Sequence, residues 1–513
     1  MEHTYRNSRR LLILIITFVT ILIGLTQISR AQESTDIYPY RHNIKEQHSM
    51  RVLNSGVAAL WARIDMIRRA QTSLELEYFI FNPDTAGRII MREMVAAADR
   101  GVKVRLLIDK SKAVFVLDDY YAEVLAKKGI EVRYYNGAPL IWISTIQFRN
   151  HRKLIVRDGL EAIVGGRNIA DEYFDLSPKF NFLDRDIWVE GKIVTTMVES
   201  FNSFWDNEIV EQAGTPRKPH LNDFPSSDDG DDYMRVQQYQ QRLKSYNKQI
   251  AAAASTLVAS AEEREVLKYV VSYGPEALGL TNQRSCPHVA FATDRAGATF
   301  IRRLNSNNYH KNYRYLRKEI RDWMDLITTE VTFDSPYLLN NSRSRKILFD
   351  LLERGVQVNF LTNSLASTDA IYVSTVFSQE VKRYREYDKL NTYIYKGDFS
   401  EESELISDQV REAVWGTHSK TIIFSKDAFM IGTFNIDNRS SFYNTELAIF
   451  CQGSKELRDD VMANVELRMK GAKKLGPDGQ PEDGTPLLEG TSLSKKALYF
   501  LLKVPATILK FLL

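Results

Sequence analysis

The sequence HRK at residues 151–153 is followed by Asp158 and then by GGRN at residues 165–168. The same order returns later in the chain, with HSK at residues 418–420 and GTFN at residues 432–435. Each copy has the pattern of two short apolar strands joined by a turn. One such copy could be a strand–turn–strand unit with an incidental histidine, so the interpretation depends on whether the surrounding sequence repeats as well.

The neighbourhood of the motif is repeated too. RGVKVRLL at residues 100–107 recurs as RGVQVNFL at residues 354–361. Each follows a strand-like segment and a helix-like segment, which lie at 73–80 and 89–98 in the first half and at 330–334 and 344–353 in the second. The same order of elements twice predicts an α/β fold of two homologous domains. We expect each to be a mixed β-sheet flanked by helices, with both histidines at the pseudo-twofold interface.

The repeated polar residues are suited to a phosphodiester. Histidine can act as a nucleophile or as a proton carrier near neutral pH. Lysine places a compact positive charge on phosphate oxygens, and asparagine donates hydrogen bonds to them. Neither copy contains a cluster of metal ligands, so we expect no metal and no cofactor. The candidate catalytic residues within the two motifs are His151, Lys153, Asp158, Asn168, His418, Lys420 and Asn435.

A carboxylate follows each motif at the same distance from a later glycine. Asp184 lies seven residues before Gly191, and Glu446 lies seven residues before Gly453. Each opens a short apolar strand, where it could accept the Nδ1 proton of a catalytic histidine and fix its tautomer. The alternative is an ordinary acid at a strand edge, and Asp186 is a second candidate in the first copy. Equal spacing favours the functional role.

These residues resemble the signature of the phospholipase D superfamily, which carries two HxKxxxxD motifs, each followed by G-G/S-x-N. The resemblance covers roughly residues 50 to 450. Within that superfamily the chain is most similar to bacterial cardiolipin synthases of the C type. The segments that carry this similarity are ELEYFI at 75–80, AAADRG at 96–101, TNSLASTD at 362–369 and NIDNRSS at 435–441.

The resemblance implies a mechanism. His151 would attack phosphorus to form a phosphohistidine, and His418 would protonate the leaving alcohol and then deprotonate the acceptor. The lysines and asparagines would hold the non-bridging oxygens. With phosphatidylglycerol as the acceptor the product would be cardiolipin. With water as the acceptor the enzyme would be a hydrolytic phospholipase D, and with a nucleic acid as the donor it would be a nuclease.

The second motif departs from the family pattern, because Ser425 stands where the first copy has Asp158. The resemblance implies that this aspartate supports the motif rather than touching substrate, so we expect activity to survive. A lipid-binding scaffold with a decayed second site is the non-enzymatic alternative, which the intact His418, Lys420 and Asn435 disfavour.

Length and charge narrow the class of protein. A chain of 513 residues is expected to hold two to four domains. The net charge of +3 is nearly balanced, which disfavours a nucleic-acid partner. We predict a first domain, a linker with a connecting helix, a second domain and a flexible tether. These parts are placed at residues 45–210, 211–267, 268–470 and 471–493, respectively.

Both ends of the chain indicate a membrane. Three arginines precede the apolar run at residues 11–25, which predicts a signal peptide or an N-terminal anchor over residues 1–31. Either places the catalytic part outside the cytoplasm, on the periplasmic side of the inner membrane or exported. Residues 494–513 are expected to form an amphipathic, membrane-associating tail, with packing against a domain as the alternative. The expected partners are a membrane surface and phospholipids, namely phosphatidylglycerol and, as an alternative, phosphatidylethanolamine.

Two further residue types bear on the fold. Cys286 and Cys451 are the two cysteines; export would permit a disulfide, but we expect Cys451, in an apolar strand, to be a buried thiol. Trp415 lies three residues before His418, and it is the tryptophan we would test for a place in a lipid groove.

Overall fold

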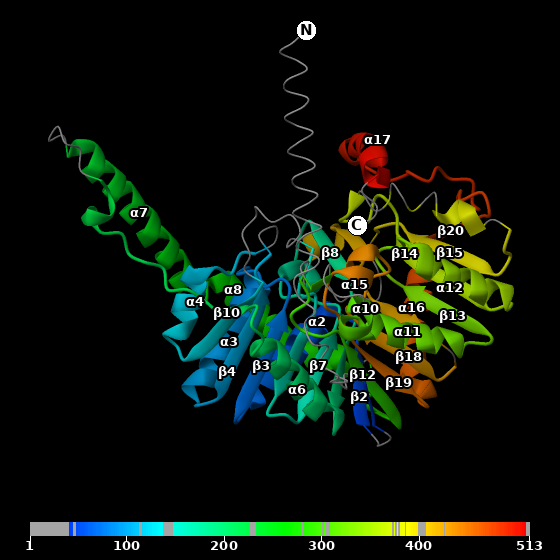
Figure 1. The fold of residues 1–513 in the computed structure, drawn as a ribbon, viewed down its shortest axis with the longest axis horizontal. Helices are drawn as coiled ribbons and strands as arrows, with labels where there is room; N and C mark the ends of the chain where they lie inside the picture. The colour runs from blue at the N-terminus through cyan, green and yellow to red at the C-terminus, as the bar shows by residue number, and fades with distance from the viewer. Residues whose placement is uncertain are drawn as a thin grey trace, which may run out of the picture.

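The computed structural model describes residues 41–508, with gaps at residues 45–47, 112–114, 137–146, 226–231, 280, 300–301, 304–307, 372–373, 375–376, 378–379, 385, 399–406 and 425. For residues 41–44 and 503–508 it describes the backbone alone. Within this part of the chain the protein is α/β, with two nine-stranded mixed sheets side by side and helices on their outer sides (Figure 1). The predicted fold class is therefore confirmed.

The first sheet has the order β10-β5-β4-β3-β6-β7-β9-β2-β11. Strands β3, β4 and β5 are parallel, and the other neighbours are antiparallel. The strands are β2 (His48–Leu53), β3 (Ser73–Tyr78), β4 (Lys103–Asp109), β5 (Ile130–Tyr135), β6 (Leu154–Arg157), β7 (Glu161–Gly165), β9 (Asp186–Glu190), β10 (Val210–Gln212) and β11 (Arg284–Cys286).

The second sheet has the order β20-β15-β14-β13-β17-β18-β19-β12-β1, which repeats the first element for element. Its strands are β1 (Arg41–Ile44), β12 (His288–Thr293), β13 (Glu330–Asp334), β14 (Gln357–Asn363), β15 (Leu390–Tyr395), β17 (Thr421–Ile423), β18 (Ala428–Gly432), β19 (Leu447–Gln452) and β20 (Ala472–Leu475). The two sheets exchange their outermost strands, because β1 pairs with β12 while β11 pairs with β2.

Helices cover the outer faces of both sheets and fill the space between them. The helices in and around the two domains are α2 (Gly56–Arg69), α3 (Thr85–Asp99), α4 (Asp119–Ala126), α6 (Ile193–Trp205), α10 (Tyr309–Tyr313), α11 (Tyr315–Asp325), α12 (Ser342–Glu353), α14 (Asp408–Arg411), α15 (Asn438–Phe442) and α16 (Lys455–Lys470). There are also three short 3₁₀ turns among the described elements, namely η1 (Asp171–Tyr173), η2 (Leu221–Asp223) and η3 (Lys382–Tyr384).

Alternate residues of the strands enter different cores. In β6, Ile155 joins the outer core beneath α2 and α3, while Leu154 and Val156 enter a central core that also contains residues of the second sheet. Successive side chains of a strand point to opposite faces, so a strand that is apolar throughout is buried on both. Helices α6 and α16 contribute to the central core, and α11 and α12 cover the far face of the second sheet.

The connection between the domains differs from the prediction. The helix-like stretch after the linker is two helices, α7 (Tyr233–Ser255) and α8 (Ala261–Gly279). Helix α7 projects from the body of the molecule, whereas α8 packs against α2 (Figure 1). The tether predicted for residues 471–493 begins instead with β20, which pairs with β15.

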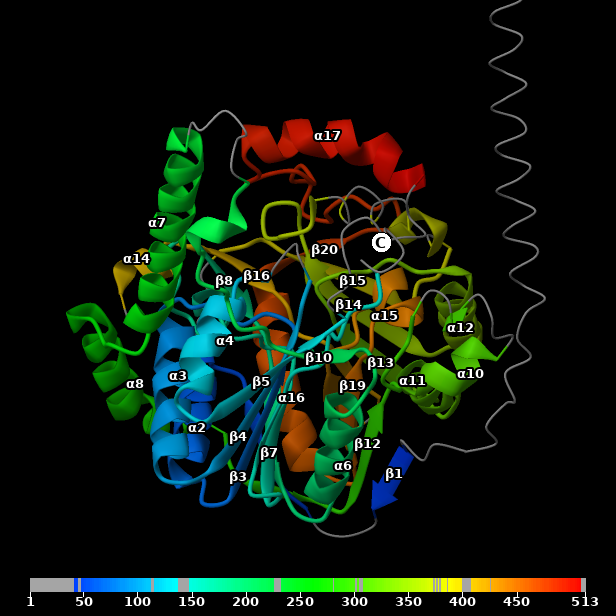
Figure 2. The ribbon, with the colours of Figure 1, turned by 60° about the vertical axis from the view of Figure 1, so that its left-hand side comes forward.

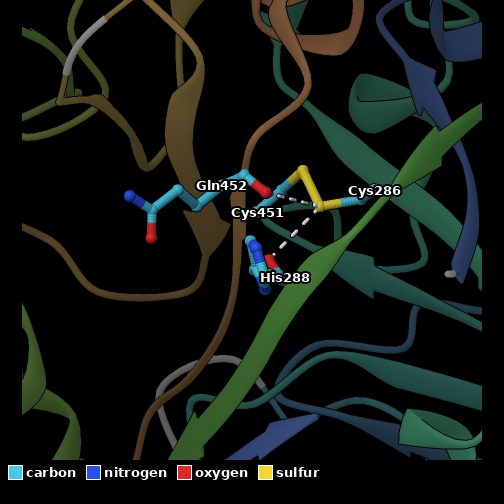
Figure 3. Close-up of a disulfide and its surroundings, with 4 residues drawn as sticks. All are labelled: Cys286, His288, Cys451 and Gln452. Carbon is cyan, nitrogen blue, oxygen red and sulfur yellow. Dashed lines mark hydrogen bonds between the residues drawn. A yellow bond between two sulfur atoms is a disulfide. The ribbon is translucent and has the colours of Figure 1, made fainter. Parts of the chain in front are cut away.

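A disulfide bond joins Cys286 to Cys451, whose Cα atoms are 6.1 Å apart (Figure 3). The expectation of a buried thiol at Cys451 is therefore wrong. Strand β12 begins two residues after Cys286 and runs beside β19 with His288 opposite Gln452, which brings Cys286 next to Cys451. Because β11 belongs to the first sheet and β19 to the second, the bond links the two sheets covalently.

The C-terminal helix α17 (Leu493–Ile508) lies across one end of the molecule, above β8 (Phe180–Leu183) and α15 (Figures 1 and 2). Lys495 Nζ donates hydrogen bonds to the carbonyl oxygens of Ala366 and Thr368, at 2.9 and 3.0 Å. Tyr499 is buried on the same side of the helix. The exposed apolar side chains of its first ten residues are Leu493, Leu498, Phe500 and Leu501.

The described residues contain no helix with the length and apolarity needed to cross a membrane. The predicted signal peptide or anchor, residues 1–31, lies outside the described residues.

Candidate active site

The two histidines come together at the junction of the domains through matching backbone contacts. The backbone N–H of His151 donates to the carbonyl of Thr445, at 3.0 Å, and that of His418 donates to the carbonyl of Leu183, at 2.8 Å. Thr445 directly precedes Glu446, and Leu183 directly precedes Asp184. Each histidine is therefore fixed beside the carboxylate of the other half.

The side chains form two crossed His–carboxylate pairs. His151 Nδ1 lies 2.9 Å from Glu446 Oε2, and His418 Nδ1 lies 2.5 Å from Asp184 Oδ2. All four side chains are buried. Since Nδ1 is engaged in both rings, Nε2 is the atom that each histidine can direct at a substrate. Asp186, the second candidate, instead contacts Arg63 and Arg167, at 2.8 and 3.4 Å.

Each motif glycine permits a close approach. A Cβ atom on Gly166 would lie 2.1 Å from Asp184 Oδ1, and a Cβ on Gly432 would lie 2.4 Å from the carbonyl of Leu447. Any side chain on Gly166 would displace the carboxylate that holds His418. Thr433 is the residue of the second half that matches Gly166. Its hydroxyl accepts a hydrogen bond from Leu447 N at 3.0 Å.

Both lysines are buried beside the histidines. Lys153 Nζ donates to the carbonyl of His151 at 2.7 Å. Lys420 Nζ lies 2.5 Å from His418 Nδ1 and 3.8 Å from Asp184 Oδ2. Burial and the charge of Lys420 lower the pKa of Lys153 well below its usual value. The two ammonium groups therefore share one small volume, where an anion would relieve their repulsion.

The two asparagines take up different local bonds. Asn168 Oδ1 accepts a hydrogen bond from the backbone N–H of Ile80 at 3.2 Å, which leaves its amide group to donate. Asn435 is buried, and its Oδ1 has no hydrogen-bond partner among the described residues. An orphaned buried polar atom at this place fits a site that is completed by a ligand.

Asp158 does not belong to this cluster. It lies at the opposite end of β6 from His151, in the turn before β7, with a φ of 53°. Its carboxylate accepts hydrogen bonds from the backbone N–H groups of Thr72 and Ser73, at 2.7 and 3.0 Å. Its place among the catalytic residues is therefore corrected to a supporting one, which ties the motif hairpin to the start of β3. Ser425, at the matching position, lies outside the described residues.

The fold and the constellation can be compared with known proteins. The family model "Cardiolipin synthase, PLD-like domain" matches the chain twice, at residues 63–205 and 324–467. The chain belongs to the phospholipase D superfamily.

Relatives of this phospholipase D-family chain extend along most of its length. An uncharacterized protein of Helicobacter pylori is 29% identical over 470 residues, which is 86% of this chain and 85% of the relative. Cardiolipin synthase C of Escherichia coli is 26% identical over 406 residues, covering 77% of this chain and 79% of the relative. The solved structure of phosphatidylserine synthase from Haemophilus influenzae covers 90% of this chain and 95% of its own, with a TM-score of 0.58 and 14% identity. That structure shows a shared fold.

The two dyads of this phospholipase D-family site differ electrostatically. Burial favours the neutral form of Asp184, but the charges of Lys420 and His418 outweigh it and hold the pKa of that carboxyl below its usual range. Burial raises the pKa of Glu446 to about 7, against the charge of Lys153. Asp184 is therefore ionised at neutral pH, whereas Glu446 is protonated in part of the molecules.

The pKa values of the two histidines are lowered to different extents. Burial and Lys153 lower the pKa of His151 well below its usual value, and the charges of Lys420 and His418 act in the same direction. Burial and Lys420 also lower the pKa of His418, but Asp184 opposes them. The neutral imidazole is therefore favoured in both rings, and more strongly at His151 than at His418, where Asp184 favours the protonated form.

Buried groups that the sequence did not reveal hold the dyads in place. Asp109 Oδ2 accepts from Asn150 N at 2.7 Å, and Asn363 Oδ1 accepts from Thr417 N at 2.8 Å. They support the residues directly before His151 and His418. Both lie nine residues after the arginine of their Arg-Gly-Val strand, so the repeat itself carried the signal.

An ionic cluster crosses the junction as well. Asp334 pairs with Arg185 at 3.2 Å and with Arg468 at 2.7 Å, and all three side chains are fully buried. Arg185 comes from the first half, so this cluster ties the halves together directly behind Asp184. Nothing in the spacing of a single copy distinguishes these residues from surface charges.

Phenylalanine rings pack against both catalytic histidines, whereas the tryptophan singled out from the sequence does not line a lipid groove. Phe79 packs against His151 at a ring separation of 5.2 Å, and Phe182 packs against His418 at 4.6 Å. Trp415 is fully buried in a cluster with Leu183 and other apolar residues, so it does not line a lipid groove. Within the described residues, no group of three or more His, Cys, Asp or Glu side chains is placed to hold a metal ion.

Proposed function

We propose that the protein is a phosphatidyltransferase that makes cardiolipin by transphosphatidylation, through a phosphohistidine on His151. The observation that carries the proposal is the pair of crossed dyads, in which the ionised Asp184 favours the protonated form of His418 while the pKa of His151 lies further below its usual value. Similarity to cardiolipin synthase C of Escherichia coli supports the choice of phospholipid.

The chemistry follows from the positions of the groups. His151 Nε2 attacks the donor phosphorus, the phosphorus–oxygen bond to the headgroup breaks, and His418 gives its proton to the leaving oxygen. His418 then takes the proton of the acceptor hydroxyl, whose oxygen attacks phosphorus and releases His151. Lys153, Lys420 and the amides of the two asparagines stabilise the charge on the non-bridging oxygens during both steps.

Product analysis by mass spectrometry tests the proposal. Purified full-length protein is given vesicles of phosphatidylglycerol, with and without phosphatidylethanolamine, in the presence of EDTA. We expect cardiolipin from the intact protein and none from a His151→Ala variant, and headgroup labelling then identifies the donor. Phosphatidic acid without cardiolipin would contradict the transferase and indicate a hydrolytic phospholipase D instead. Cleavage of nucleic acid but not of lipid would contradict both.

We also propose that the C-terminal helix attaches the protein to the membrane surface. Leu493, Phe500 and Leu501 have exposed fractions of 84%, 63% and 71%, while Lys495 and Tyr499 hold the other face of the helix to the second domain. Burying a large apolar side chain is favourable by about 1.5–3 kcal/mol. A helix docked in this way presents its apolar side chains outward, which suits a bilayer interface.

Replacing exposed apolar residues of α17 by acidic ones tests whether the helix attaches the protein to the membrane. We expect the double variant Phe500→Glu, Leu501→Glu to bind vesicles of phosphatidylglycerol and phosphatidylcholine at least about tenfold more weakly in sedimentation. Leu160→Glu is the matched control, because Leu160 is 61% exposed in the turn between β6 and β7. Equal binding of all three proteins would show that α17 does not contact lipid.

We propose an extracytoplasmic location, on the periplasmic side of the inner membrane or exported. The basic and apolar N-terminal sequence supports it, and so does the disulfide between Cys286 and Cys451, since such bonds persist in oxidising compartments. Protease added to intact spheroplasts should digest the protein; complete protection would contradict this location.

A further inference from the structure

The loop that follows β14 is built against the strand that carries His418. Asn363, the last residue of β14, donates from Nδ2 to the carbonyl of Thr417, at 2.8 Å, as well as accepting from its N–H. A Cβ atom on Gly416 would lie 2.3 Å from the carbonyl oxygen of Ser367. The loop and β16 (Val414–Thr417) therefore pack backbone to backbone immediately before the catalytic histidine.

The same loop is fixed from two other directions. Ser367 Oγ donates to the carbonyl of Tyr395, at 2.9 Å, and Lys495 of α17 caps the carbonyls of Ala366 and Thr368. A loop with its carbonyls and hydroxyl bonded in this way holds its next residue, Asp369, in a defined place.

Asp369 is an exposed carboxylate at the end of this loop. Both of its oxygens accept a hydrogen bond from the Tyr337 hydroxyl, at 3.1 Å. Burial lowers the pKa of both His418 and Lys420, and the negative charge of Asp369 opposes this, which places Asp369 within electrostatic reach of the two side chains.

The first half has no acid at the matching place, so this carboxylate breaks the pseudo-twofold symmetry. Phe115 lies six residues after the end of β4, as Asp369 does after β14. Phe115 packs against Tyr134 at a ring separation of 5.1 Å, and His151 has the apolar ring of Phe79 beside it. The two halves therefore differ at this position, which holds an aromatic ring in the first half and a carboxylate in the second.

We propose that Asp369, held by Tyr337, is a specificity residue that binds the headgroup alcohol entering or leaving beside His418. Its carboxylate accepts a hydrogen bond from a second donor on that headgroup, either a free hydroxyl of a glycerol or the ammonium of an ethanolamine. The inference rests on the proposed function, in which His418 exchanges its proton with the headgroup oxygen. The phosphate stays with the lysines, while a headgroup that donates hydrogen bonds meets the acid.

The decisive comparison uses leaving groups with and without hydrogen-bond donors. Full-length Asp369→Asn protein is assayed on vesicles of phosphatidylglycerol, phosphatidylethanolamine and phosphatidyl-p-nitrophenol, by total loss of donor lipid. We expect kcat/KM to fall about tenfold on the headgroup that the wild type prefers, and by less than about twofold on the p-nitrophenyl lipid. Tyr337→Phe should show the same pattern with a smaller loss. Asp408→Asn is the control, because Asp408 is a 98% exposed acid of the same domain.

Asp369→Leu separates the two donor chemistries. An amide oxygen still accepts from a hydroxyl, so a glycerol headgroup predicts a larger loss for leucine than for asparagine. An ammonium headgroup predicts similar losses, because both variants remove the charge. Equal changes in kcat/KM on all three lipids, or no change in it, would contradict a headgroup-binding role for Asp369. If the wild type produces phosphatidic acid alone, the transferase proposal fails while the leaving-group comparison still decides the role of Asp369. A wild type inactive on every lipid would overturn both.

Discussion

Turnover of phospholipid is expected to fall by at least about 10⁴-fold when His151 is replaced by alanine, whatever the leaving group. The reason is that His151 supplies the atom that bonds to phosphorus in the proposed mechanism, and its low pKa keeps that nitrogen free of a proton. Burial lowers the pKa of both Lys153 and Lys420, and the charges of Glu446 and Asp184 oppose this by favouring the cations that would stabilise the phosphate oxygens. The measurement is steady-state release of headgroup from phosphatidylglycerol.

His418→Ala should respond to the leaving group in a way that His151→Ala does not. A glycerol oxygen needs a proton to leave, so turnover of phosphatidylglycerol should again fall by about 10³-fold or more. p-Nitrophenolate leaves without one, so this variant should release up to one equivalent from phosphatidyl-p-nitrophenol and then stall.

The control for both variants is His288→Ala, which removes an exposed histidine of β12. It should retain wild-type rates, and circular dichroism should show that all three proteins are folded. If the two active-site variants lost activity equally on both lipids, the division of roles between the histidines would be wrong.

Asp184→Asn is expected to lower kcat by about 10³-fold, because an amide fixes the wrong tautomer of its histidine and no longer stabilises the imidazolium. It should also shift the pH profile. Asp184 raises the pKa of His418, so its loss lowers that pKa. Since the alkaline limb of kcat/KM reports loss of the proton from the general acid, this limb should move to lower pH.

Glu446→Gln is the matched comparison in the other dyad. Burial places the pKa of Glu446 at about 7, so below that pH the wild-type carboxyl is already neutral in most molecules. The variant should therefore lose less activity than Asp184→Asn, and the gap should be widest in acid. A Glu446→Gln profile displaced as far as that of Asp184→Asn would show that the two dyads are electrostatically equivalent.

The sequence was sufficient for the parts of the fold that local patterns determine. The Arg-Gly-Val segments become β4 and β14, and the motif hairpins become β6–β7 and β17–β18. The spacing of apolar residues and the positions of turn residues are local features of the sequence, so their repetition predicts a repeated structure. The predicted His and Lys side chains of the two copies are brought into one cluster with Asp184 and Glu446.

Other features depend on how the halves meet, which no local pattern encodes. Equal spacing identified Asp184 and Glu446, but each serves the histidine of the other half. The exchanged strands β1 and β11 and the Cys286–Cys451 bond arise in the same way. Asp158 was a candidate because it belongs to the motif, but a motif gives the order of residues and not which end of a strand faces the chemistry; its supporting role is the one that the resemblance implies.

The most direct test of the proposed mechanism is to locate the covalent intermediate. His418→Ala protein is incubated with phosphatidyl-p-nitrophenol, quenched in alkali, in which phosphohistidine survives, digested and mapped by mass spectrometry. We predict one phosphatidyl group per chain, on the peptide that contains His151, and none in the His151→Ala, His418→Ala double variant. An adduct on another residue, or p-nitrophenol release without any adduct, would contradict it.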